Sequence, residues 1–135
     1  KQYKNFEELL ILCDTGGSNS CSARAWKYGL YSSICKKLNI AVTICHYPSG
    51  ASKWYPIEHR LFSYITQNWA GKPLRSYEII LKYIQNTTTK TGLKVESFLN
   101  EKEYKKAIKI SDEDFEQINI KNHDVLPRWN YTIYP

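Results

Sequence analysis

Residues 9–13, Leu-Leu-Ile-Leu-Cys, form a continuous apolar run that stops at Asp14. Such a run is typical of a strand covered on both faces, as in parallel sheets. Apolar residues at helical spacing follow over 22–38, and a second apolar run, rich in β-branched residues, covers 40–46. A strand, a helix and a strand without a hairpin signal form a βαβ unit with parallel strands. The sequence therefore predicts an α/β fold.

Two acidic residues are expected to meet at one edge of this sheet. Asp14 ends the first strand, and Glu58 follows Pro56 in the first turn of a helix predicted over 55–69. The positive end of the helix dipole favours an ionised carboxylate there. Sites in open α/β sheets form beyond the carboxyl ends of the strands, and the chain leaves the second strand at that edge. We therefore expect Asp14 and Glu58 on one rim, close enough to share a divalent ion.

Shorter patterns describe the rest of the chain. They predict four elements: a helix over 76–85, a weak strand over 93–95, a capped helix over 111–118 and a half-exposed strand over 129–133. In the helix over 76–85, four apolar residues are expected to face inward: Tyr77, Ile80, Leu81 and Ile84. Ser18, Asn19 and Ser20 are candidates for the N-cap of the helix over 22–38.

Composition and charge favour a single globular domain with a polyanion as partner. The chain has 135 residues, of which 42% are hydrophobic and 24% charged, and its net charge is +6. No acidic residue lies between Asp14 and Glu58, whereas several lysines and one arginine do. Two isolated acidic residues among basic ones are the pattern expected where metal ligands face a phosphate backbone.

The cysteines and the apolar runs indicate a reduced, cytoplasmic protein. None of the cysteines has a zinc-like spacing, and Cys13 and Cys45 lie inside the two strand patterns as small apolar residues. No apolar run reaches membrane-spanning length, so no membrane partner is expected. Because the first residue is Lys rather than Met, we expect a piece of a longer protein.

The segment Asp-Thr-Gly at 14–16 resembles the active-site signature of aspartic proteases. Three features argue against that family. The residues after the turn have helical periodicity, no later apolar-apolar-Gly element is present, and the protease mechanism has no use for a helical Glu58. The resemblance is short, and we reject it.

A second resemblance spans nearly the whole chain. It rests on Asp-Thr-Gly-Gly-Ser-Asn at 14–19, Arg-Ala-Trp-Lys at 24–27, His-Tyr-Pro-Ser-Gly-Ala-Ser-Lys-Trp at 46–54, Ile-Glu-His-Arg-Leu-Phe-Ser at 57–63, residues 87–95 and the closing residues 129–135. Together these motifs resemble the Rhodopirellula-type DDE transposases, which are bacterial insertion-sequence enzymes with an RNase H-like core. The resemblance implies a partial RNase H-like core over about 1–70 and a family-specific extension over about 71–135.

In that family Asp14 and Glu58 resemble the second and third acids of the catalytic triad, and the first Asp would precede Lys1. The implied reaction is DNA cleavage and strand transfer at insertion-sequence ends, assisted by two Mg²⁺ or Mn²⁺ ions. Lys53, Arg60 and Lys90 are candidates for contacts with the DNA backbone. With two of three acids, the chain alone is expected to be inactive.

Two further expectations concern the state of this chain. The alternative to a catalytic fragment is a non-catalytic nucleic-acid-binding remnant of a decayed or truncated transposase gene. If the first core strand is missing, residues 9–13 should present an open apolar sheet edge. Unpaired edges recruit partners. We therefore expect either self-association through this edge or its coverage by the chain's own strand over 129–133.

Overall fold

The computed structural model describes residues 5–105 and 107–135, without the side chain of Ser52. Contacts between residues divide the chain into two compact units. The core unit comprises Lys1–Ser52 and Lys105–Pro135, and the helical unit comprises Lys53–Tyr104. In sequence, the helical unit is therefore inserted between two parts of the core unit. None of the helices within the described ranges has the length and apolar character that a membrane crossing requires.

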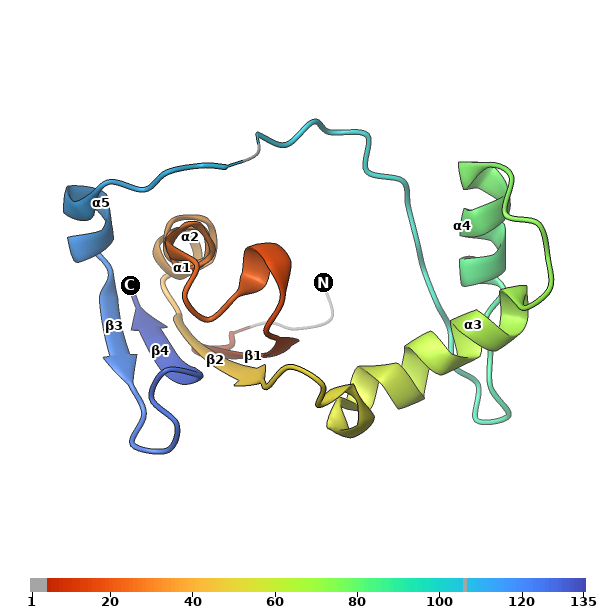
Figure 1. The fold of residues 1–135 in the computed structure, drawn as a ribbon, viewed down its shortest axis with the longest axis horizontal. Coiled ribbons are helices and arrows are strands. Elements are labelled where there is room, and N and C mark those ends of the chain that lie inside the picture. Colours follow the sequence, from red (N-terminus) through yellow and green to blue (C-terminus); the bar gives the residue numbers. More distant parts are fainter. Residues whose placement is uncertain (1–4, 106) are drawn as a thin grey trace. The chain divides into compact units, whose positions relative to one another are not determined.

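A four-stranded mixed sheet forms the centre of the core unit (Figure 1). Its strands are β1 (Glu8–Asp14), β2 (Ala41–Tyr47), β3 (Asn119–Asn122) and β4 (Asn130–Tyr134), in the spatial order β1-β2-β4-β3. β1 and β2 are parallel and in register from Glu8 opposite Ala41 to Asp14 opposite Tyr47. β4 runs antiparallel to both β2 and β3. The mixed α/β class and the parallel pair predicted from the two apolar runs are confirmed.

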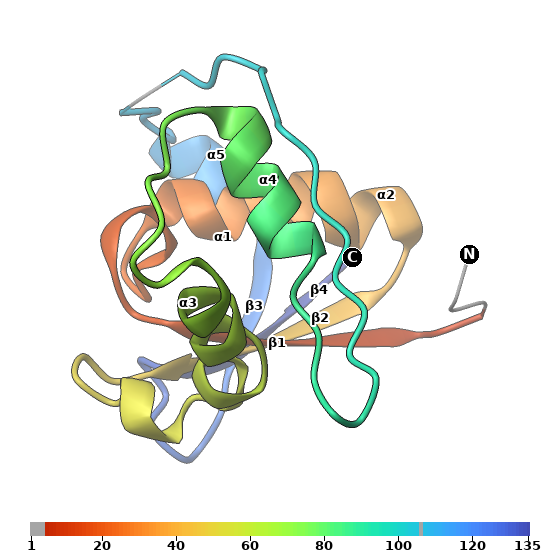
Figure 2. The same cartoon turned by 90° about the vertical axis from the view of Figure 1, so that its right-hand side faces the viewer.

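One continuous helical segment joins the parallel strands. It consists of α1 (Arg24–Leu30), a π-helical turn (Tyr31–Cys35) and α2 (Lys36–Leu38), and it ends at Asn39, whose φ of 52° is left-handed. This confirms the helix predicted over 22–38. In Figure 2 the segment lies above the strands of the sheet. The apolar core between them contains Leu30, Cys35, Val42, Ile44, Tyr131 and Ile133.

The N-cap prediction for this helix is wrong. The residue before α1 is Ala23, which makes no side-chain cap, and residues Gly17–Asn19 instead form a short 3₁₀ turn. The candidate Asn19 is used elsewhere, because its amide group hydrogen-bonds to Asp14.

The last strand differs most from its prediction. Tyr131 and Ile133 are 0% exposed and Thr132 is 6% exposed, so β4 is buried on both faces rather than half-exposed. Tyr131 and Ile133 belong to the apolar core, and the Thr132 hydroxyl hydrogen-bonds to the side chains of Thr43 in β2 and His123. The prediction that this strand covers β1 is also wrong, since β4 pairs with the opposite side of β2. β1 forms an edge of the sheet, and the expectation that it is covered on both faces is wrong, since Leu10 is 58% and Leu12 40% exposed on one face.

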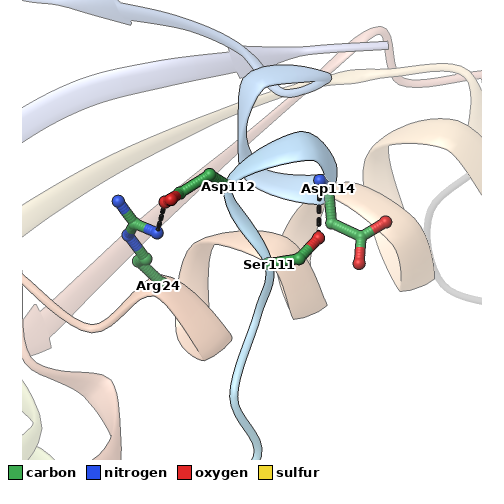
Figure 3. A network of polar contacts seen from close by, with 4 residues as sticks. All are labelled: Arg24, Ser111, Asp112 and Asp114. Atoms are coloured by element: carbon green, nitrogen blue, oxygen red, sulfur yellow. Dashed lines mark hydrogen bonds and ion pairs between the residues drawn. The ribbon is translucent and has the colours of Figure 1, made fainter.

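α5 (Asp112–Glu116) packs beside α1 in the core unit (Figure 3). The Ser111 hydroxyl accepts a hydrogen bond of 3.1 Å from the backbone N–H of Asp114, which confirms the predicted cap. Arg24 of α1 forms an ion pair with Asp112 and lies 4.9 Å from the centre of the Phe115 ring. The α-helix ends at Glu116, two residues short of the predicted end at Ile118.

The helical unit contains a π-helical turn (Glu58–Phe62) that continues into α3 (Ser63–Trp69), followed by α4 (Tyr77–Gln85). The two predicted helices are thus confirmed. Asn68 of α3 donates to the carbonyl of Tyr83 in α4, which ties the two helices together. Of the residues expected to face inward from α4, Ile80, Leu81 and Ile84 are half-buried, but Tyr77 is 65% exposed. The predicted strand over 93–95 is wrong, since these residues form no strand.

Candidate functional site

Asp14 lies at the carboxyl edge of the parallel strand pair. It is the last residue of β1 and stands opposite Tyr47, the last residue of β2. Its side chain is exposed. The chain continues from Tyr47 toward Glu58, so the segment that carries the second predicted acid leaves the sheet beside Asp14. This edge is where sites of open α/β sheets form.

The turn after β1 folds back to hold one oxygen of this carboxylate. The side-chain amide of Asn19 donates to Asp14 Oδ1 at 2.9 Å and to the Asp14 carbonyl at 3.2 Å. The turn needs glycine at Gly17, whose φ is +54°. A Cβ atom on Gly16 would stand 3.7 Å from Asp14 Oδ2. No hydrogen bond to Oδ2 occurs among the described residues, so this oxygen can serve a ligand.

A buried polar network lies directly behind Asp14. His46 of β2 is 6% exposed, and its Nδ1 lies 3.2 Å from the Asp14 carbonyl oxygen and 3.3 Å from Cys13 Sγ. Its Nε2 lies 3.1 Å from the Tyr131 hydroxyl of β4. The network thus joins three neighbouring strands, β1, β2 and β4, at the edge that carries Asp14.

Burial keeps the members of this network uncharged. It lowers the pKa of His46, raises the pKa of Tyr131 and raises the pKa of the Cys13 thiol to about 11. The ring, the hydroxyl and the thiol are therefore neutral near pH 7. Lys27 of α1 places its Nζ 4.7 Å from the centre of the Tyr131 ring, and burial lowers its pKa as well.

Glu58, the second predicted acid, belongs to the helical unit. It is the first residue of the π-helical turn, it is half-buried, and its backbone N–H donates to the Tyr55 carbonyl at 3.1 Å. Within the described part of the chain its carboxylate has no hydrogen bond and no ion pair. The neighbouring His59 donates from Nε2 to the Lys53 carbonyl at 2.7 Å, which fixes the segment before the helix.

The three predicted DNA-binding cations also lie in the helical unit and are exposed. The Nζ of Lys53 lies 5.2 Å from the centre of the Trp54 ring. Lys90 sits in a turn that the Thr89 hydroxyl stabilises by accepting from the Leu93 N–H at 3.2 Å. Arg60 is in the π-helical turn with Glu58. Asp14 is the one predicted site residue in the core unit, so its pairing with Glu58 stays a prediction.

The donor atoms fit a hard divalent cation. Mg²⁺ and Mn²⁺ prefer carboxylate oxygens and keep several water ligands, so one or two carboxylates are a sufficient protein contribution. Asp14 Oδ2 and the Glu58 carboxylate are oxygens of this kind. Among the residues that the structure describes, no three His, Cys, Asp or Glu side chains gather into a closed metal site.

Sequence reasoning missed three residues that contact Asp14 or its network: Asn19, His46 and Tyr131. The position of Asn19 in the turn after Asp14 and that of His46 near the end of the second strand were signals that could have found them, because both put the residue at the predicted edge. Tyr131 had no such signal, since its contact depends on β4 lying next to β2.

Comparison with known protein families matches residues 1–135 to the Rhodopirellula transposase DDE domain. The match covers the whole chain, and the chain belongs to this family. Neither the curated proteins nor the solved structures gave a match.

Proposed function

We propose that this member of the Rhodopirellula transposase DDE domain family is part of an enzyme that cleaves DNA at insertion-sequence ends and joins the freed strand to a target. Family membership over the full length supports the transposase assignment. The observation that carries the chemistry is Asp14, an exposed carboxylate at the carboxyl edge of β1 with one oxygen held by Asn19. The parallel β1–β2 pair with its connecting helix is compatible with an RNase H-like core.

Asp14 and Glu58 are the residues that would hold Mg²⁺ or Mn²⁺. Divalent ions in such sites stabilise the attacking and leaving oxygens of an in-line displacement at phosphorus. The chain's own contribution is to orient the oxygens: Asn19 fixes Oδ1 of Asp14, and Oδ2 remains for the ion. The π-helical turn presents Glu58 with a carboxylate that has no partner within the described residues.

Lys53, Arg60 and Lys90 are proposed to contact DNA phosphates. All three are exposed and lie in the helical unit with Glu58. Such contacts add salt-dependent affinity without reading sequence. Replacing one of them with alanine should lower the slope of log affinity against log salt concentration by about one unit. An unchanged slope in all three variants would rule out this surface.

Self-association through β1 is a further part of the proposal. β1 is an edge strand, and Leu10 on it is 58% exposed. Apolar edge strands recruit other strands. Light scattering on the purified chain tests this, and a monomer at all concentrations would contradict it.

We further propose, from the family, that the protein acts in the bacterial cytoplasm on the DNA of the nucleoid.

The metal site is tested by titrating the purified chain with Mn²⁺ and measuring the free ion by electron paramagnetic resonance. Asp14→Ala and Glu58→Ala should each raise the Kd about tenfold or more, since each removes a ligand. Glu8→Ala is the matched control, because it removes an exposed carboxylate from the opposite end of β1. Unchanged affinity in both site variants would overturn the site and favour a non-catalytic nucleic-acid-binding remnant.

A further inference from the structure

The carbonyl of Asp14 receives hydrogen bonds from two sides. On the solvent side, Asn19 Nδ2 lies 3.2 Å from it, and on the buried side, His46 Nδ1 lies 3.2 Å from it. A carbonyl oxygen has two lone pairs, so these donors fill its capacity. The peptide beyond it leads into Gly16 and Gly17, which restrict the backbone less than any other residues. His46 therefore supports the Asp14 carbonyl from outside the turn, in addition to Asn19 within it.

The partners of His46 decide which ring nitrogen carries the proton. A carbonyl only accepts, so Nδ1 must be protonated to bond to Asp14. If Nδ1 were unprotonated, two acceptors would face each other at 3.2 Å, and only the weak S–H donor of Cys13 would compensate. Nε2 is then the acceptor, and the Tyr131 hydroxyl, 3.1 Å away, donates to it. The Asp14 carbonyl thereby selects the tautomer of His46, and the Tyr131 hydroxyl, which can donate or accept, donates to the unprotonated Nε2 of that tautomer.

We propose that His46 is a positioning residue for Asp14, and that Tyr131 orients the His46 ring by donating a hydrogen bond to its Nε2. The bond from Nδ1 fixes the backbone at the end of β1, so that the carboxylate stays where Asn19 can hold Oδ1 and leave Oδ2 for a divalent ion. The inference rests on the proposed function, because it assumes that Asp14 binds the ion. Supporting hydrogen bonds of this kind change metal affinity by about 10- to 100-fold.

Two substitutions of His46 separate positioning from packing. In His46→Asn the amide nitrogen stands as many bonds from Cβ as Nδ1, so it can still donate to Asp14. In His46→Gln the amide stands where Nε2 was, near Tyr131, and the donor to Asp14 is lost. Both variants remove the ring from the same buried position. A merely structural role would make their stability and Mn²⁺ affinity change together.

The experiment measures the Mn²⁺ Kd and the thermal midpoint of the full chain as wild type, His46→Asn, His46→Gln and Asp14→Ala. We expect His46→Gln to raise the Kd about tenfold and His46→Asn to raise it about threefold or less. Equal affinities in the two His46 variants would overturn the positioning role. If Asp14→Ala leaves the Kd unchanged, the proposed function itself fails, whichever way His46 behaves.

A second measurement does not depend on the His46 variants folding. Long-range ¹H–¹⁵N correlation spectra of the wild-type chain report which ring nitrogen of His46 carries the proton. We expect the Nδ1–H tautomer in the wild type, and a changed ¹⁵N shift of Nε2 in Tyr131→Phe, which removes the donor to that nitrogen. An Nε2–H tautomer in the wild type, or an unchanged Nε2 shift in Tyr131→Phe, would overturn the proposal.

Discussion

Asn19→Ala should weaken Mn²⁺ binding about fivefold without disturbing the fold. The lost interaction is the 2.9 Å hydrogen bond from Asn19 Nδ2 to Asp14 Oδ1. Hydrogen bonds to charged groups contribute about 1.5–3 kcal/mol, and solvent exposure here reduces that to about 1 kcal/mol. A change of about 1 kcal/mol corresponds to about a fivefold change in Kd. Because Asn19 is not the N-cap of α1, the helix should keep its stability.

The assay is a Mn²⁺ titration at constant ionic strength, with Ser18→Ala as the matched control. Ser18 is exposed in the same turn, and its hydroxyl makes no hydrogen bond within the described residues. Equal Kd values for the two variants would refute the reasoning that Asn19 orients the carboxylate. A tighter Kd in Asn19→Ala would refute it differently, by showing that Asn19 competes with the ion for Oδ1.

Three further predictions test the core unit. Ile133→Ala should lower the free energy of unfolding by about 3 kcal/mol, because Ile133 is fully buried. Leu10→Ala should lower it by less than about 1 kcal/mol, because Leu10 is exposed. Equal losses in urea denaturation would contradict the central place of β4. A double-mutant cycle on Arg24 and Asp112 should give a coupling below about 1 kcal/mol, since both side chains are half-exposed or more, and a value above about 2 would contradict that. Alkylation of Cys13 at pH 8 should be much slower in the native chain than in urea, because burial raises its pKa to about 11; mass spectrometry finding equal rates would count against the buried network.

The parts of the fold that could be predicted are those with a local pattern. The apolar run of β1 and the β-branched run of β2 identify two strands, although only β2 is central in the sheet, and the helical spacing between them identifies the crossover. Parallel pairing follows from that order alone, and it brings Asp14 to the carboxyl edge. The Ser111 cap could be predicted for the same reason, because its hydrogen bond joins Ser111 to Asp114, only three residues along the chain.

The strand order could not be predicted, because it depends on contacts between distant segments. β4 alternates apolar and polar residues, a pattern that indicates one exposed face, yet its polar Thr132 is buried against the side chains of Thr43 and His123. β3, Asn-Ile-Lys-Asn, has one apolar residue and no strand signal of its own. The segment is a strand because it pairs with β4, and not because of its own composition.

The difference between local patterns and distant contacts also explains why the predicted site contained the two acids but not the residues that hydrogen-bond to Asp14. A carboxylate after a strand and another in a first turn are visible in sequence, because the chemistry of a metal ligand is carried by the residue itself. A positioning residue is defined by its partner. The sequence pattern favours Asn19 as a cap, because Asn is common there, and His46 as the end of a strand, and neither assignment includes the Asp14 carbonyl.

Tyr131 links the C-terminal strand to the predicted site. It comes from the last strand, after the whole helical unit, yet its hydroxyl bonds to His46 beside Asp14. The C-terminal residues therefore complete the edge that the first strands begin, and the segment with Glu58 is inserted between them in sequence. A chain that ended after the helical unit would keep both acids and lose β4. Asp14 would then lack the hydroxyl that orients its buried support, so we expect the C-terminal strand to be needed for Asp14 to keep its position.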